Sequence, residues 1–136
     1  MDRELFETAR AVRERAYAPY SRFPVGAAVR TAAGAVHAGA NVENASYPEG
    51  WCAETSALAA MVAANPAGSG RTIAAVCVVA NRIGGRLTTP CGGCRQRLAE
   101  FCGPDTKVTV ADPDGLSQTF LMSDLLPAAF ALEETR

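Results

Sequence analysis

Cysteines and a glutamate stand at two places in the chain where their types and spacing suit a metal-dependent reaction. Cys52 and Glu54 begin the segment CAETSALAAMVAA, an alanine-rich helix former that needs neither group in order to fold. Cys91 and Cys94 follow Pro90, a residue that favours the first turn of a helix. Because residues i and i+3 project from one face of a helix, Cys91 and Cys94 can hold one ion together. The sequence therefore predicts two helices that begin with metal-binding side chains.

Zinc is the metal that this set of ligands favours. A helix N-terminus lowers the pKa of a thiol, and the thiolate is the form that binds metal. If the two helices pack side by side, the sulfurs of Cys52, Cys91 and Cys94 meet, and soft sulfur ligands indicate zinc. Cys77 is expected to be a buried apolar side chain of a strand, and Cys102 to lie too far along the second helix. The fourth coordination position is then open, as in catalytic zinc sites.

An open zinc site implies hydrolytic chemistry. Zinc lowers the pKa of bound water toward ~7 and so supplies hydroxide, and Glu54 is placed to move the protons. The pattern C-x-E followed by P-C-x-x-C is the signature of zinc deaminases, with cysteine in place of histidine at its first position. Taken singly, the features have simpler explanations: Cys91 and Cys94 also fit a redox pair, and Glu54 fits a first-turn acid favoured by the helix dipole. His37, on a predicted strand, is expected to be solvated or hydrogen-bonded.

Composition excludes two classes of partner. The 136 residues carry a formal net charge of −1, whereas nucleic-acid binders normally show a basic surface. The longest apolar run, 74–80, is far shorter than the ~20 residues that span a membrane. The charged N-terminal segment does not resemble a secretory signal, and five cysteines do not suggest a disulfide framework. We expect a single cytoplasmic domain over residues 1–136, with neither nucleic acid nor membrane as partner.

Helices and strands are expected to alternate along the chain. Apolar periodicity and turn residues predict helices at 5–16 (with Asp2 as N-cap), 52–64 and 91–101. Strands are expected at 25–31, 35–42, 73–80, 107–111 and 117–122. Ser123 is predicted to cap a last helical turn that ends at Leu126. The first two strands form a hairpin, while strands separated by helices favour parallel neighbours, so we expect a mixed sheet between layers of helices.

Several separated segments resemble the small, homotetrameric cytidine deaminases. In chain order they are PYSRFPVGAAV (19–29), NVENASY (41–47), CAE (52–54), TPCGGCRQ (89–96) and LLPAAF (125–130). The resemblance implies a three-layer α/β/α sandwich with a five-stranded mixed sheet. It also implies hydrolysis of cytidine or deoxycytidine to uridine or deoxyuridine and ammonia, in pyrimidine salvage. Glu54 would be the proton shuttle and zinc-bound hydroxide the nucleophile.

The same resemblance implies roles for residues around the nucleoside. Asn41 and Glu43 would hydrogen-bond the ribose, Glu43 at the 3′-hydroxyl, and alternate residues of a strand do project to one face. Phe23 and Ala53 would contact the substrate from the same chain. For Phe23, ordinary packing is the alternative.

Other implied contacts come from neighbouring subunits of a homotetramer. Phe130 would reach the pyrimidine of a neighbour and stack on it, unless it serves ordinary packing, and Ala45 and Tyr47 would help close the pocket. The active species would therefore be a homo-oligomer with composite active sites.

One position departs from the family pattern. Members with three cysteine ligands usually carry arginine directly after the catalytic glutamate, where this chain has Thr55. Zinc with three thiolates has a net charge of −1, so a nearby cation or donors to sulfur are needed. We expect Arg95 to donate to a zinc-bound sulfur or to lie close to the cluster, and Thr55 to add a neutral hydrogen bond. Backbone amides at the helix N-termini are the alternative.

Two other functions stay open at this point. The first is deamination of another cytosine-bearing small molecule such as blasticidin S, although the NVENASY and PYSRF segments favour a nucleoside. The second is a non-catalytic zinc-binding module, which a fourth protein ligand would indicate.

Overall fold

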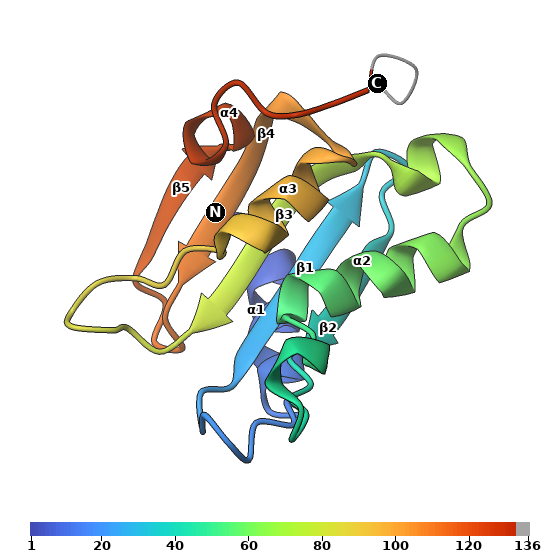
Figure 1. Cartoon of the computed structure of the whole chain (residues 1–136). Coiled ribbons are helices and arrows are strands. Elements are labelled where there is room, and N and C mark those ends of the chain that lie inside the picture. The colour runs from blue at the N-terminus through green and yellow to red at the C-terminus, as the bar shows by residue number, and fades with distance from the viewer. Residues whose placement is uncertain (133–136) are drawn as a thin grey trace.

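A five-stranded mixed sheet forms the centre of the molecule (Figure 1). The computed structural model describes residues 1–132, and the strand order is β2-β1-β3-β4-β5. The strands are β1 (Val25–Thr31), β2 (Val36–Ala40), β3 (Ile73–Ala80), β4 (Cys102–Ala111) and β5 (Ser117–Leu121). β3 and β4 run parallel, and the other neighbouring pairs are antiparallel. The predicted mixed sheet is confirmed.

Helices cover both faces of this sheet and make the three predicted layers. α1 (Arg3–Arg13) packs on one face, over β1, β2 and β3. α2 (Ala53–Ala64), α3 (Gly92–Ala99) and α4 (Met122–Leu125) cover the other face (Figure 1). Two 3-10 turns, η1 (Tyr47–Glu49) and η2 (Gly68–Arg71), lie before and after α2. None of the helices within residues 1–132 has the length and apolar character that a membrane crossing requires.

Asp2 fixes the start of α1 as the sequence predicted. Its carboxylate accepts a hydrogen bond of 3.1 Å from the backbone N–H of Leu5, which satisfies one free donor of the first turn. The Arg30 guanidinium of β1 also donates to this carboxylate at 2.8 Å, and this hydrogen bond lowers the pKa of Asp2. One side chain therefore ties the helix to the strand below it.

The C-terminal part of the fold differs from the sequence prediction in two boundaries. The predicted helix 91–101 ends at Ala99, and β4 begins at Cys102 instead of residue 107. The reason is a long-range contact, because the carbonyl of Phe101 accepts a hydrogen bond from the N–H of Ile73 at the start of β3. Ser123 lies inside α4 and does not cap it. Asp124 instead accepts from the N–H of the N-cap residue.

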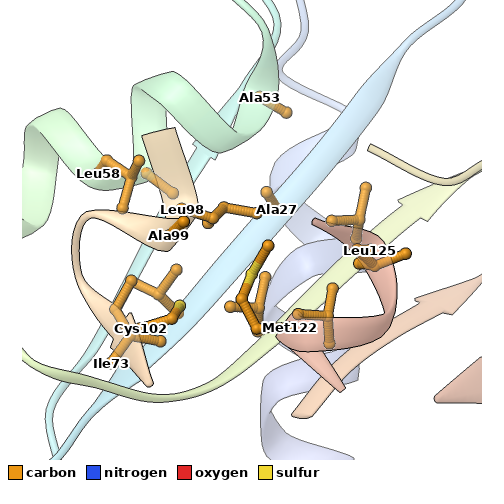
Figure 2. Close-up of a cluster of buried hydrophobic side chains, with 14 of the residues drawn as sticks. Ala27, Ala53, Leu58, Ile73, Leu98, Ala99, Cys102, Met122 and Leu125 are labelled. Carbon is orange, nitrogen blue, oxygen red and sulfur yellow. The ribbon is translucent and has the colours of Figure 1, made fainter. Parts of the chain in front are cut away.

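The larger hydrophobic core lies between the sheet and the helices α2, α3 and α4 (Figure 2). Valines of β3 and β4 form its floor, and Ala53, Leu58, Leu98, Met122 and Leu125 reach it from the covering helices. Close approach of α2 depends on small residues. A Cβ atom on Gly39 of β2 would lie 2.4 Å from the backbone nitrogen of Ala57, so glycine is required where the helix crosses the strand. This contact sets the height of α2 above the sheet.

Substitution of Gly39 tests this packing. Gly39→Ala should lower the free energy of unfolding by about 2–3 kcal/mol, because overpacking against backbone forces the helix to shift. Chemical denaturation measures the change. Gly103→Ala is the matched control, because its new Cβ would meet only Thr106 Oγ1 at an ordinary 3.9 Å. Equal stability of both variants would show that α2 is free to move without loss.

Candidate metal centre

The N-termini of α2 and α3 bring three thiols together. Cys52 is the N-cap of α2, Cys91 is the N-cap of α3, and Cys94 lies in the first turn of α3. The three sulfur atoms lie within 4.8 Å of one another. Cys94 is buried, Cys52 is half-buried and Cys91 is exposed, so the cluster is held from the protein side and open to solvent on the other.

This donor set fits a zinc ion with an open position. Within residues 1–132, no histidine, aspartate or glutamate offers a ligand atom to the same group. His37 lies on β2, and its Nε2 is 3.1 Å from Asn65 Nδ2, which agrees with the prediction of a hydrogen-bonded histidine. Cys77 is buried in β3, where burial raises the pKa of its thiol to about 12. Cys102 is also outside the cluster, although on a strand and not on the predicted helix.

Local electrostatics prepare the sulfurs for a cation. The positive end of a helix dipole acts on Cys52 and Cys91, and neither side chain caps its own helix by a hydrogen bond. A hydrogen bond with the Cys94 thiol lowers the pKa of Cys52, and the same contact together with burial raises the pKa of Cys94. Thr55 Oγ1 lies 3.8 Å from the Cys94 sulfur, where its hydroxyl can donate. Of the two thiols, Cys52 is therefore the one whose ionised form is favoured before a metal binds.

Glu54 lies in the first turn of α2, between Cys52 and Thr55, and is almost fully buried. Burial raises the pKa of its carboxyl, while its own backbone N–H, the Cys94 thiol and the charge of Arg97 act in the opposite direction. A carboxyl whose pKa is raised toward the working pH is suited to both accepting and donating a proton. Two residues from a ligand, this group is placed to move protons at the cluster.

Arg95 does not make the contact that the sequence suggested. Its guanidinium donates to the carbonyls of Pro90 at 2.8 Å and Leu125 at 2.9 Å, and to the Thr89 hydroxyl at 3.0 Å. Among residues 1–132 these oxygens are its hydrogen-bond partners, and the expected bond to a sulfur is not among them. Arg95 thus joins the entry of α3 to the end of α4, and each of its three guanidinium nitrogens already donates one hydrogen bond. Thr55 Oγ1, in contrast, lies 3.8 Å from the Cys94 sulfur.

A hollow of about 270 Å³ lies beside the segment that leads into Cys52. Its lining residues are Tyr20, Ser21, Glu43, Asn44, Tyr47 and Gly50. Backbone hydrogen bonds in both directions join Val42 to Trp51, with lengths of 2.9 and 2.8 Å. Trp51 directly precedes Cys52, so this bridge connects the lining of the hollow to the segment that leads into the thiol cluster.

The residues expected at the ribose also hold the loop before β1. Asn41 Oδ1 accepts from the N–H of Val25 at 2.8 Å, and its Nδ2 donates to the carbonyl of Phe23 at 3.0 Å. Glu43 accepts from the N–H groups of Tyr20 and Ser21, both at 3.0 Å. Sequence reasoning missed this second use of Asn41 and Glu43. Ser21, the serine of the PYSRF segment, was the signal for the contact with Glu43, because a serine hydroxyl can donate to a carboxylate.

The remaining predicted substrate residues differ in exposure. Tyr47 and Phe130 are 74% and 70% exposed, so both large rings are available to another molecule. Ala45 is also exposed. Ala53 is fully buried in the core, its backbone included. Phe23 is half-buried next to Asn41.

Comparisons with known proteins agree with this site. The family model described as "Cytidine and deoxycytidylate deaminase zinc-binding region" matches residues 1–111. A cytidine deaminase from Halalkalibacterium halodurans is 45% identical over 135 residues, which cover 98% of each chain. The crystal structure of cytidine deaminase from Burkholderia pseudomallei has a TM-score of 0.85 and 43% identity, over 96% of this chain and 99% of the other. A cytidine deaminase from Mycobacterium tuberculosis has a TM-score of 0.78 and 36% identity, over 97% and 99% of the two chains.

Metal content tests the thiol cluster. Purified protein should contain about one zinc per chain, and Cys52→Ala, Cys91→Ala and Cys94→Ala should each lose most of it, because each variant leaves two sulfurs. Elemental analysis after dialysis against a weak chelator measures the loss. Cys102→Ala is the control and should keep its zinc. Full zinc content in Cys52→Ala would exclude the assigned site.

Proposed function

The chain belongs to the cytidine and deoxycytidylate deaminase family, and we propose that it hydrolyses cytidine and deoxycytidine to uridine and deoxyuridine with release of ammonia. The observation that carries the proposal is the group of three thiols with the buried Glu54 in the same helical turn. This arrangement contains the ligands of a catalytic zinc and a proton carrier and offers no fourth protein ligand among the described residues. The lack of a fourth ligand argues against a purely structural zinc module.

Cys52, Cys91 and Cys94 would hold the zinc, and the chain offsets their charge with neutral dipoles. When bound there, zinc supplies the Lewis acidity that activates a water molecule for hydrolysis. The hydroxyl of Thr55 lies where it can donate to the Cys94 sulfur, and the N-termini of α2 and α3 direct their backbone N–H groups toward the ligand-bearing turns. Such contacts to the ligands tune how strongly a metal acidifies water.

Glu54 carries the protons of the proposed reaction. Carbon C4 of cytosine is a poor electrophile until ring nitrogen N3 is protonated. Glu54 would accept a proton from the attacking water, deliver it to N3 and then assist the departure of ammonia. Its burial supports this role, because burial raises the pKa of the carboxyl and keeps bulk water from the transferred proton.

The complete pocket is proposed to form between copies of the chain in a homotetramer. Exposed rings of Tyr47 and Phe130 support this assembly, because large aromatic side chains are enriched at protein interfaces. In the assembled enzyme Phe130 would stack on the pyrimidine bound by a neighbouring subunit, while Ala45 and Tyr47 would close that pocket. Within residues 1–132 the five cysteines form no disulfide, which supports a reducing, cytoplasmic setting.

Turnover of cytidine tests the proposed reaction. Wild-type enzyme should convert cytidine to uridine with one ammonia released, and Glu54→Gln should lower kcat by at least ~10²-fold while zinc is retained, because glutamine keeps the shape but carries no proton. Ultraviolet absorbance and metal analysis measure the two effects. Glu14→Gln is the surface control. Release of ammonia from blasticidin S but not from cytidine would assign the related activity instead.

Mixed oligomers test the shared pocket. Phe130→Ala alone should raise KM about tenfold, since stacking on a base is worth roughly 1–3 kcal/mol. Glu54→Gln alone should be nearly inactive. When the two variants are co-assembled, some pockets combine an intact Glu54 with an intact Phe130 from the other subunit, so a component with wild-type KM should return. No such component would appear if each pocket used its own Phe130.

A further inference from the structure

The loop that carries Phe23 is fastened to Glu43 through one serine hydroxyl. Ser21 Oγ donates to Glu43 Oε2 and accepts a hydrogen bond of 3.0 Å from the N–H of Phe23. Backbone N–H groups of Tyr20 and Ser21 donate to the other carboxylate oxygen, Oε1, at 3.0 Å each. Ser21 therefore connects the orientation of the Glu43 carboxylate to the path of the loop.

The Glu43 carboxylate has a free position for one more hydrogen-bond donor. Each carboxylate oxygen accepts about two hydrogen bonds. Glu43 Oε1 already has two donors, whereas Oε2 has only the hydroxyl of Ser21. One acceptor position thus remains, on Oε2, and Glu43 lines the 270 Å³ hollow together with Ser21. Within the described part of the chain, no Lys, Arg or His forms an ion pair with this carboxylate.

The remaining acceptor suits a neutral hydroxyl donor. The hydrogen bond from Ser21 is the main cause that lowers the pKa of Glu43, so the group stays ionised at neutral pH and acts as an acceptor only. The bridge between Val42 and Trp51 keeps Glu43 next to the segment that enters Cys52. A hydroxyl on a sugar attached to a base at the metal centre is a donor of the required kind.

We propose that Ser21 is a positioning residue that holds Glu43 Oε2 toward the 3′-hydroxyl of the nucleoside and so makes the enzyme selective for sugars that carry this hydroxyl. The inference rests on the proposed nucleoside substrate and on the contact between Glu43 and the 3′-hydroxyl that the family resemblance implies, and it adds Ser21 as the residue that positions Glu43. Ser21 does not touch the thiol cluster, so its effect falls on binding and not on the chemical step. A purely structural role, in which Ser21 only holds the Phe23 loop, predicts an effect that is independent of the 3′-hydroxyl.

Kinetics with paired substrates separate these roles. Ser21→Ala should raise KM for cytidine about tenfold, in line with the loss of a charge-assisted hydrogen bond, while kcat changes less than about twofold. For 3′-deoxycytidine, wild-type KM should already be high, and Ser21→Ala should change it less than about threefold. Ser21→Thr keeps the hydroxyl and should restore KM for cytidine. Ser117→Ala, an exposed serine of β5, is the matched control.

The measurements distinguish failure of the positioning role of Ser21 from failure of the proposed deaminase function. Equal KM increases for the two substrates in Ser21→Ala, or failure of Ser21→Thr to restore KM, would overturn the positioning role. A thermal unfolding midpoint for Ser21→Ala within a few degrees of wild type shows that the variant is folded; if it is not, Ser21→Cys, of similar size with a weaker donor, takes its place. Absence of turnover in the wild-type enzyme would instead refute the proposed function.

Discussion

The metal centre depends on the close contact between α2 and the sheet. Gly39 has no side chain where α2 crosses β2, and the helix presents alanines to the sheet, so its axis lies close to the strands. That position sets the direction in which the N-terminus of α2 points and therefore where Cys52 lies. α3 packs beside α2 on the same face, and the two helix ends bring their sulfurs within 4.8 Å. Ligand geometry is thus a result of backbone packing.

One helical turn combines three different environments for three adjacent residues. Cys52 is half-buried at the positive helix end, Ala53 is packed in the core, and Glu54 is buried, with no cationic hydrogen-bond partner among residues 1–132. The helix end favours a negative sulfur, whereas burial favours a neutral carboxyl. A thiol and a carboxyl with opposed preferences therefore lie two residues apart, because the helix begins at the edge of the core; these are the proposed metal ligand and the proposed proton carrier.

Local signals in the sequence predicted the parts of the structure that depend on neighbouring residues. β1 and β3 were predicted with their observed bounds, since a turn or an apolar β-branched run marks each of them. The thiol cluster followed from helix starts and spacing. The end of α3 was missed because the Phe101 carbonyl pairs with Ile73, a contact between distant residues. The contact of Arg95 with Leu125 and those of Glu43 with Tyr20 and Ser21 also join distant residues, so they could not be predicted from spacing.

The ligands come from two different connections of the fold, and this has a consequence for how the chain unfolds. Cys52 enters the helix that leads to β3, whereas Cys91 and Cys94 enter the helix that leads from β3 to β4. A bound metal therefore links the two helices across the central strand, and its binding free energy stabilises the folded chain, because the three sulfurs meet only in the fold. Separation of the two helices requires release of the ion, so metal loss and opening of the central parallel strand pair become one cooperative event. The metal centre therefore also joins the two helices that precede and follow β3 in the chain.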